Sequence, residues 1–580
     1  MSHFLATAAE IVGGVALIAT GVGAAGSIGL FGAGFAGSSI ATTIATIAKV
    51  ASFAAAALAA GSALTAKRLS SASPDAWAAD PNAGMDIVFG EACNSGHIVY
   101  RQAYDDKNKY QTEVTHWSIG PVHSIDQLYV DNIARDVVGT VVDMPDKGKF
   151  HEARQLGLCP EPSYLTVGPR DPWHWDASCK LSGKAAIITT FEYDSKSSTT
   201  FTSIPTCGWR GKGVLCYQPR KDGTYPGGVG AHRSDDETTW EWSDNPYDVG
   251  LTWCLGWRQN GKLVAGAGLP IAGIVVADFV EGANVADANG WKVGGTRSTS
   301  DDHWDVLKDI LQAGGGQPLR LGALLGCVVN APRVSLATIG RDDLAQGDIS
   351  IVAMAARRDR INAVAPRYRA ELLTNVTATV NGQVRLYTAS TWADVSAPPI
   401  VVDDYVTADG RQRRKEVQYP LVQCFAGEQP TQVAQLARYD IEDAREFGPI
   451  TLPLKIRWMG YKPGDVVTVN LPEVGLFHQD VMILSRTLEA STGVVTITAR
   501  SETAAKHAFA LGQTTTPPPA PSLPANAWAF EVPGLAAVEG EIDALSATVA
   551  TQAEIVAGQG EDISTVDKRT RNYDGQVQLQ

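Results

Sequence analysis

The stretch GMDIVFGEACNSGHIVYRQAY (residues 84–104) holds two short runs of apolar and β-branched residues around a Cys-Asn-Ser turn. Runs of this composition, bounded by turn-forming residues, are typical of strands joined in a hairpin. The same alternation returns in TEVTHWSIG (112–120), TVVDMP (140–145), KAAIITTFEY (184–193) and GKGVLCYQP (211–219). We therefore expect residues 84 to about 252 to form mostly antiparallel sheet.

Helical periodicity appears further along the chain, in residues 271–290, 300–316 and 429–448. In the second of these, Ser300 or Asp301 is the expected N-cap and a glycine run is the expected stop. Its apolar face is expected to consist of Trp304, Val306, Leu307, Ile310 and Leu311. Strand patterns return after residue 449 and run to about residue 502. The sequence therefore predicts an α+β chain dominated by antiparallel β-sheet.

The N-terminal region is apolar over an unusual length. Residues 11–48 contain no charged side chain, and a second uncharged run, 50–66, follows Lys49. About 20 residues cross a bilayer as a helix, so two spans would fit, while a secretory signal would be shorter and preceded by basic residues. The abundant Gly and Ala suit close helix packing. Its candidate membrane or plug residues are Ile11, Val15, Leu17, Ile28, Leu30, Phe31, Phe35, Ile40, Ile44 and Ile47.

Three interpretations of this apolar segment remain open. It is a permanent anchor, a plug buried inside an oligomer, or a segment released into a membrane on demand.

The C-terminal region carries a seven-residue repeat. A Pro-rich spacer (514–526) leads into five heptads whose a column is apolar and whose d column contains Gln552 and Gln559. Sustained heptads predict a coiled coil, and a surface amphipathic helix is the alternative. The expected seam residues are Leu535, Val538, Ile542, Leu545, Val549, Val556, Ile563 and Val566.

Charge and cysteine content narrow the class of protein. The 580 residues carry a net charge of -14, which disfavours general or sequence-specific nucleic-acid binding because an acidic surface repels phosphate. Eight cysteines are too sparse for a disulfide scaffold. A Cys207–Cys216 hairpin disulfide, or a metal site formed with Cys159 and Cys179, is the alternative to buried free thiols.

No established catalytic motif is present. His116 and His123 flank WSIGPV, and His174 lies near Asp171, Asp176 and Cys179, a set that could ligate metal but is more typical of a packed loop. The acid-rich residues 232–246 lack the spacing of a calcium loop. We expect no enzyme activity, no cofactor and no bound metal.

Several stretches, taken in order, resemble a known family. They include residues 77–131, then GKGVLCYQPRKDGTYPGG (211–228) followed by TTWEWSDNPYDVGLTW (238–253). INAVAPRYRAELLTN, RRKEVQYPLV, QVAQLAR and MGYKPGDVVTVN continue the pattern. Together, over roughly residues 72–513, they are similar to the central tail hub of siphophages, the lambda-type tip attachment or host specificity protein J family.

The resemblance implies a structural virion protein at the tail tip, assembled in the host cytoplasm. It implies a homotrimer that closes the tail tube beneath a ring of distal tail protein. Its further partners would be the tape measure protein, other tail tip and fibre proteins, and a host membrane or receptor. The alternatives are a membrane-anchored bacterial adhesin or secretion spike, and a tail-associated cell-wall hydrolase.

These inferences predict six segments along the chain. They are an apolar segment (1–67), β-rich hub domains with a loop-rich insertion (68–252), a helical α+β module (253–335), C-terminal hub β domains (336–513), a Pro-rich linker (514–534) and the coiled-coil start of a central fibre (535–580).

Overall fold

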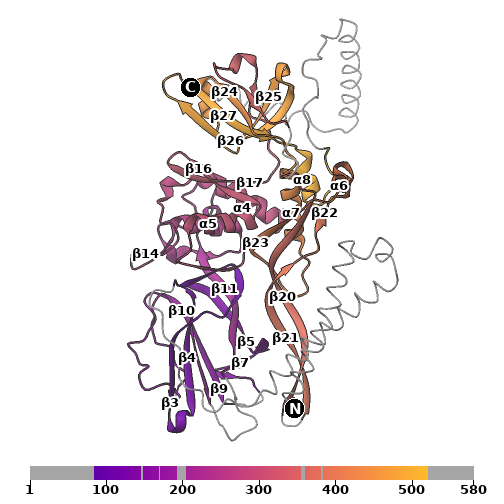
Figure 1. Ribbon diagram of the computed structural model, residues 1–580. Helices are drawn as coiled ribbons and strands as arrows, with labels where there is room; N and C mark the ends of the chain where they lie inside the picture. The colour runs from indigo at the N-terminus through magenta and orange to yellow at the C-terminus, as the bar shows by residue number, and fades with distance from the viewer. Residues whose placement is uncertain are drawn as a thin grey trace, which may run out of the picture.

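The computed structural model describes residues 84–519, apart from 145–147, 169, 193–203, 354–358 and 381–382. Figure 1 shows three tiers: two β-sheets at one end, a helical layer in the middle, and a separate β-sheet at the other end. A long two-stranded ribbon runs along the side of the first two tiers. The predicted apolar segment and coiled coil, with all their candidate residues, lie outside the described residues.

Two large sheets form the first tier, and they confirm the prediction of a mostly antiparallel α+β chain. The first has the strand order β3 (His97–Tyr104), β4 (Tyr110–Ile119), β10 (Lys184–Glu192), β9 (Phe150–Leu156), β8 (Val141–Val142) and β7 (Val137–Val138). The second has the order β12 (Glu241–Trp242), β11 (Cys207–Cys216), β5 (Val122–Val130), β6 (Ile133–Arg135), β21 (Gln383–Ser396), β20 (Ala363–Val380) and β22 (Ile400–Val401), with β2 (Glu91–Asn94) beside β11 and β23 (Arg414–Cys424) beside β20.

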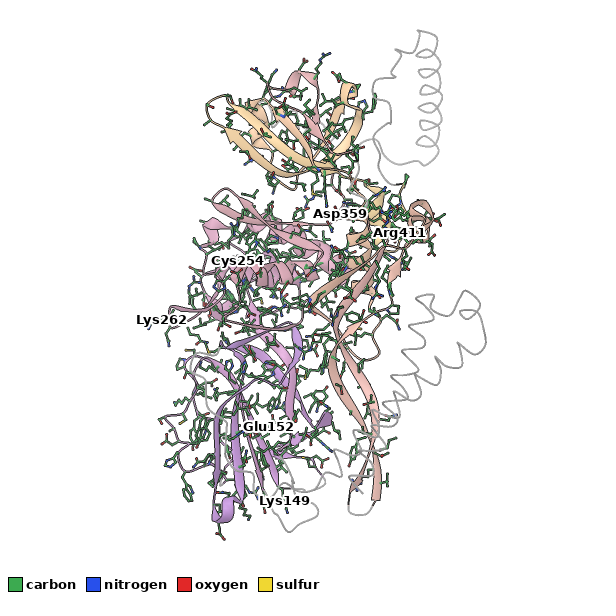
Figure 2. The ribbon with its side chains drawn as sticks, in the orientation of Figure 1. Lys149, Glu152, Cys254, Lys262, Asp359 and Arg411 are labelled. Atoms are coloured by element: carbon green, nitrogen blue, oxygen red, sulfur yellow. The ribbon has the colours of Figure 1, made fainter. Side chains whose placement is uncertain are left out.

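Buried tryptophans join the two sheets. The indole Nε1 of Trp117 donates to the Trp209 carbonyl at 3.0 Å, and Trp209 Nε1 donates to Glu152 Oε1 at 2.9 Å. Glu152 lies on β9 within the lower tier, where Figure 2 labels it. Its carboxylate also pairs with Arg154, so the buried charge is compensated.

The helical layer consists of α3 (Pro246–Leu255), α4 (Val276–Asn289) and α5 (His303–Ala313), with the hairpins β13 (Trp257–Gln259)–β14 (Lys262–Ala265) and β16 (Gly316–Leu321)–β17 (Leu324–Val329). The short strand β1 (Asp86–Phe89) pairs with β15 (Gly295–Ser298) from this layer. One hydrophobic core runs through both tiers, from Ile87 and Trp117 to Trp253 and Leu311. Residue 252, the expected boundary between two segments, lies inside α3. This helix is buried in the core that the two tiers share.

The last tier is a six-stranded sheet with a core of its own. Its order is β18 (Thr338–Ile339), β25 (Val466–Leu471), β26 (Leu476–Glu489), β27 (Val494–Ser501), β24 (Ile450–Leu454) and β19 (Ser350–Ile351). Residues 361–443 are inserted between β19 and β24 and return to the other tiers as β20–β23, α6 (Asp403–Asp409) and α7 (Thr431–Asp443). The segment expected to hold the C-terminal hub β domains, 336–513, contributes residues to three hydrophobic core clusters. The last helix of the described residues, α8 (Ala505–Ala510), packs beside α7.

One local expectation and one of the alternatives differ from the structure. The N-cap of α5 is Asp302, whose Oδ1 accepts from the amides of Trp304 (2.9 Å) and Asp305 (3.0 Å), in place of Ser300 or Asp301. Cys207 and Cys216 stand at opposite ends of the single strand β11, so a hairpin disulfide between them is wrong. All eight cysteines are free thiols.

Membrane-spanning length was a question raised by the sequence. Within the described part of the chain, no helix is both long enough and apolar enough to cross a bilayer.

Candidate functional site

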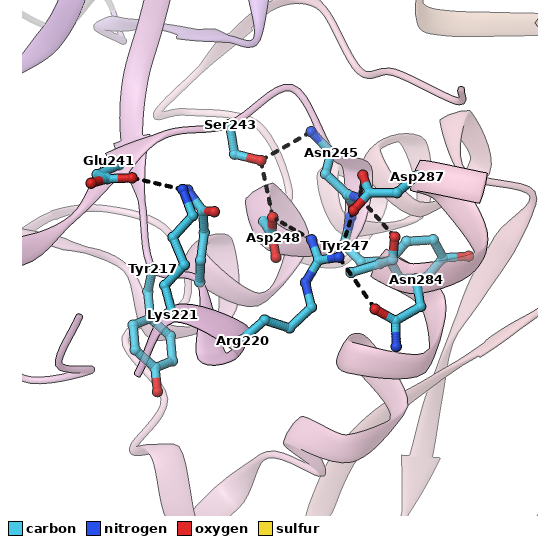
Figure 3. A network of polar contacts seen from close by, with 12 residues as sticks. Tyr217, Arg220, Lys221, Glu241, Ser243, Asn245, Tyr247, Asp248, Asn284 and Asp287 are labelled. Atoms are coloured by element: carbon cyan, nitrogen blue, oxygen red, sulfur yellow. Dashed lines mark hydrogen bonds and ion pairs between the residues drawn. The ribbon is translucent and has the colours of Figure 1, made fainter. Parts of the chain in front are cut away.

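Two of the motifs on which the family resemblance rests meet in space. Tyr-Gln-Pro-Arg (217–220) follows β11, and Trp-Ser-Asp-Asn-Pro (242–246) leads into α3. Figure 3 shows their polar side chains converging on one network, with Arg220 between the start of α3 and the C-terminal half of α4. We call this set the α3 network: Arg220, Ser243, Asn245, Asp248, Asn284 and Asp287.

Asn245 sets the start of α3. Its Oδ1 accepts a hydrogen bond from the Tyr247 amide at 2.9 Å, and Pro246 occupies the first helical position, where no amide hydrogen is needed. Its Nδ2 donates to the Ala283 carbonyl at 2.9 Å and to Asp287 Oδ1 at 2.7 Å, both on α4. One amide side chain therefore both caps α3 and ties it to α4.

Arg220 links the loop after β11 to both helices. Its guanidinium donates to Asp248 Oδ2 at 3.2 Å on α3, and to Asp287 Oδ2 at 2.5 Å and Asn284 Oδ1 at 3.3 Å on α4. Ser243 Oγ also donates to Asp248 Oδ2, at 3.0 Å, so the buried carboxylate has two partners. Burial raises the pKa of Asp248 to about 6, and the nearby Arg220 limits that rise.

The loop of the first motif is folded around Asp222. Its Oδ2 accepts from the Tyr217 hydroxyl at 2.7 Å, and its Oδ1 accepts from the Thr224 amide at 2.7 Å and from Arg233 at 3.0 Å. Burial opposes ionisation of Asp222, but these donors hold its pKa below the ordinary value. This second cluster fixes the loop that presents Arg220.

The α3 network has the chemistry of a structural contact that holds several elements in a fixed arrangement. Its cationic and anionic groups are paired with one another, and they come from a loop, a connecting segment and two helices. A partly buried, hydrogen-bonded ion-pair network of this kind fixes the relative position of the elements that supply it.

A second buried network lies where α7, α8 and β27 meet. Lys506 donates to Asp443 Oδ1 at 3.0 Å and to Glu502 Oε2 at 2.7 Å, and Arg500 donates to Asp443 at 3.1 Å. Beside it, the Tyr405 hydroxyl lies 2.8 Å from the Pro518 carbonyl and 2.9 Å from Glu442 Oε2. Burial raises the pKa of Glu442 to about 7. The start of the Pro-rich spacer is thus fixed against α6 and α7.

The histidine and acid candidates do not form one site. His116 is buried on β4, and burial lowers its pKa to about 3. The ring of His123 on β5 lies against Trp242, with 6.0 Å between the ring centroids and a tilt of 37° between the ring planes. Asp171 accepts from the Val167 amide at 2.8 Å, and Asp176 from the Ser178 amide at 2.8 Å, so both carboxylates fold their own loop. In the part of the chain that the structure covers, no three His, Cys, Asp or Glu residues gather as metal ligands would.

Sequence reasoning singled out both motifs but not their contact. The Asn-Pro pair before Tyr247 is a recognisable helix start and could have placed α3. The pairing of Arg220 with Asp248 and Asp287 has no such signal, because it depends on how α3 packs against α4.

Comparison with solved structures gives distant similarities. The chain is similar to one from the virion of a native gene transfer agent particle, with a TM-score of 0.43 and 14% identity over 76% of this chain and 90% of that chain. It is also similar to a tail protein from Neisseria meningitidis MC58, with a TM-score of 0.24 and 11% identity over 68% of this chain and 96% of that chain. No protein-family profile and no curated protein sequence matches the chain.

Proposed function

We propose that this chain is the central hub of a phage-type tail tip. Three copies close the end of the tail tube beneath a ring of distal tail protein, contact the tape measure protein inside, and continue outward as a central fibre. The role is structural and not catalytic. The protein is assembled in the host cytoplasm and acts at the tip of the virion, in host attachment and DNA ejection.

The observation that carries this proposal is the α3 network. Two of the motifs on which the resemblance to tail hubs rests lie about 25 residues apart in the chain, and Arg220 of the first pairs with Asp248, which follows the second. Their residues are used to hold a loop and two helices in one arrangement. A protein that must keep its shape while a tube is attached to it needs polar contacts that fix its elements in this way.

The C-terminal anchorage fits the same function. The Pro518 carbonyl is held by Tyr405, and the heptads begin at Leu535 in the sequence beyond it. Three copies joined by a coiled coil from Leu535 to Val566 would therefore present their hub portions side by side around one axis.

We further propose that the apolar residues 11–66 act in DNA ejection. Three such segments on one axis can shield one another from water as a plug. When the tip opens they are released toward the host envelope and insert into its membrane. The motivation is the absence of charge and the small-residue composition of this segment.

Electron microscopy and native mass measurement of the full chain test the hub proposal. We expect three copies per particle, bound at the end of tail tubes. A monomer recovered from membrane fractions would contradict the hub and favour the anchored adhesin or secretion spike. Release of soluble fragments from purified peptidoglycan would favour the cell-wall hydrolase.

A further inference from the structure

The ribbon formed by β20 and β21 is an unusual element because, among the described strands, most of its length has no hydrogen-bonded neighbour on its outer edges. The two strands pair with each other from Arg367↔Ser396 to Val380↔Gln383. On the body side, β23 pairs with β20 as far as Ala370, and β6 pairs with β21 only at Ala389. Among the described strands, none pairs with residues 371–380 on the outer edge of β20. About ten residues per strand, or roughly 30 Å, therefore extend beyond the sheet (Figure 1).

One face of this outer part, which we call the arm face, is apolar and exposed. The register places Leu373 opposite Ser390, Leu386 opposite Thr377 and Val384 opposite Thr379, so these three apolar side chains share a face. They are 55%, 67% and 71% exposed, respectively. Nearer the body, Glu371 on the same face is covered, since it accepts from the Ala426 amide at 3.2 Å and from Ser390 Oγ. The arm face thus continues a buried surface outward into solvent.

An isolated two-stranded ribbon is marginally stable in water, and long open edges with exposed apolar residues promote pairing with another chain. Natural edges are usually protected by charge, but residues 372–390 contain a single charged residue, Arg385. This composition of the outer ribbon is typical of a surface that another protein chain covers.

The charge of the outer ribbon favours a second copy of this chain as the partner that covers the arm face. A basic partner would be matched by acidic residues, and none lies in residues 372–390. Two copies of a protein with a net charge of -14 repel each other over most of their surfaces, and they approach with least repulsion where one of them carries no acidic residue.

The position of the C-terminal exit also favours a second copy. At the base of the ribbon, β22 pairs with β20 at Ala363 and Val364, and α6 follows β22 directly. Tyr405 on α6 holds Pro518, from which 16 residues lead from residue 519 to the first heptad position. A Pro-rich segment of that length spans about 50 Å, so copies joined by the heptads stand within reach of one another's ribbons.

We propose that the β20–β21 arm crosses to the neighbouring copy and buries its arm face (Leu373, Val384 and Leu386) there. This inference rests on the threefold association in the proposed function. It adds an interface that the coiled coil does not supply, and it assigns the outer ribbon its missing partner.

Photo-crosslinking in the full chain tests the contact. A benzophenone side chain at Leu386 should give covalent dimers and trimers of this chain. The same group at Val334, which is 84% exposed but lies outside the ribbon, should give at least about tenfold less. Crosslinks only within one chain, or only to a different tail protein, in a sample that native mass shows to be trimeric would overturn the arm contact and leave the hub function standing. A monomeric native mass would overturn both.

Polar substitution tests the contribution of the arm face. The triple variant Leu373→Ser, Val384→Thr, Leu386→Thr should require at least about tenfold higher protein concentration to remain trimeric on dilution, because it loses three buried apolar side chains. The control variant Val229→Thr, Val334→Thr, Leu336→Ser changes three exposed residues elsewhere and should dilute like the parent. Equal dissociation of both variants, with unchanged circular dichroism, would overturn the proposal.

Discussion

At the scale of single residues, Asn245 has several separate tasks. Its backbone amide donates to Ser243 Oγ, its Oδ1 caps α3, and its Nδ2 reaches two acceptors on α4. Because these partners are buried or partly buried, removing the side chain leaves donors and acceptors unpaired, which costs more than the hydrogen bonds themselves contribute.

Asn245→Ala should lower the free energy of unfolding by about 2–4 kcal/mol, combining a lost N-cap with unpaired buried groups. Chemical denaturation followed by tryptophan fluorescence measures this change. Asn284→Ala is the matched control, because Asn284 is exposed and makes one contact of 3.3 Å with Arg220; it should change stability by less than about 0.5 kcal/mol. Equal effects would contradict the role given to Asn245.

Asp248 predicts a pH dependence. Its pKa of about 6 in the folded protein lies above the ordinary 3.8, so the folded state binds the extra proton between these values. The contribution of this raised pKa to the free energy of unfolding is fully present below about pH 4 and is lost as pH rises through 6. The stability of the parent relative to Asp248→Asn should therefore fall by up to about 3 kcal/mol between pH 4 and pH 7. Asp305→Asn, which removes an exposed carboxylate on α5, is the matched control variant.

At the scale of elements, close packing of α3 against α4 brings the α3 network together. A Cβ built on Gly282 of α4 would lie 2.2 Å from the ring of Tyr247, so only glycine fits at this crossing. The Tyr247 hydroxyl then reaches the Gly314 carbonyl at 2.9 Å, after the end of α5. Tyr247 thus links all three helices of the middle layer.

Gly282→Ala should destabilise the protein by about 1–3 kcal/mol, because the added methyl group displaces a buried aromatic ring. A fall in melting temperature would report this. Gly273→Ala serves as control, since its added Cβ would meet nothing closer than Pro270 Cγ at 3.7 Å. A variant at Gly282 as stable as the control would show that the two helices can separate at little cost.

The coiled coil stays a prediction from sequence, and a seam substitution tests it. Ile542→Lys puts a charge at an expected a position and should raise the concentration needed for trimers at least about tenfold. Glu554→Lys lies five residues after Val549, on the expected outer face, and should leave association unchanged. If sedimentation finds the two variants alike, the heptads belong to a surface helix.

Sequence patterns predicted elements better than their assembly. Alternation gave β4, β10 and β11, and 3.6-residue periodicity gave α4, α5 and α7, since these patterns are local. The start of α3 was missed although Asn245 and Pro246 mark it, because all ten residues of the helix are buried and it shows no exposed polar face. The Arg220 ion pairs and the insertion of residues 361–443 were not predictable, since they depend on contacts between distant segments.

At the scale of the whole molecule, the tiers are tied by a few specific contacts. Lys462, in the last tier, donates to Asp278 Oδ1 on α4 at 2.6 Å, and Arg333 pairs with Glu281 of the same helix at 3.0 Å. The second buried network holds α8 against α7 beside the C-terminal exit. Gln435 and Gln432 of α7 bind Trp291 at 2.8 Å and the Ala313 carbonyl at 2.7 Å, so forces applied at the spacer would reach the helical layer through α7.

The N-terminal segment is tested at this scale. A chain lacking residues 1–66 should still trimerise and join tails, because the described core begins at Ile87, but should eject DNA at least about tenfold less efficiently. Leu17→Lys with Ile44→Lys should act like the deletion by placing charges in a membrane-inserting stretch. Plating efficiency and DNA release measure both. Normal ejection by the deleted chain would remove the proposed role of this segment.

The interrupted last tier has a consequence for biosynthesis. Ser350 of β19 pairs with Thr451 of β24, a separation of 101 residues, and Thr338 of β18 pairs with Thr468 of β25. At 5–20 residues per second, a ribosome takes about 5–20 s to make the missing partners of β19. The β20–β21 hairpin has its two halves adjacent and can close first, whereas β18 and β19 must wait unpaired. Slowing translation between codons 351 and 450 should therefore increase aggregation of the nascent chain, and chaperones that shield strand edges should be needed most in that interval.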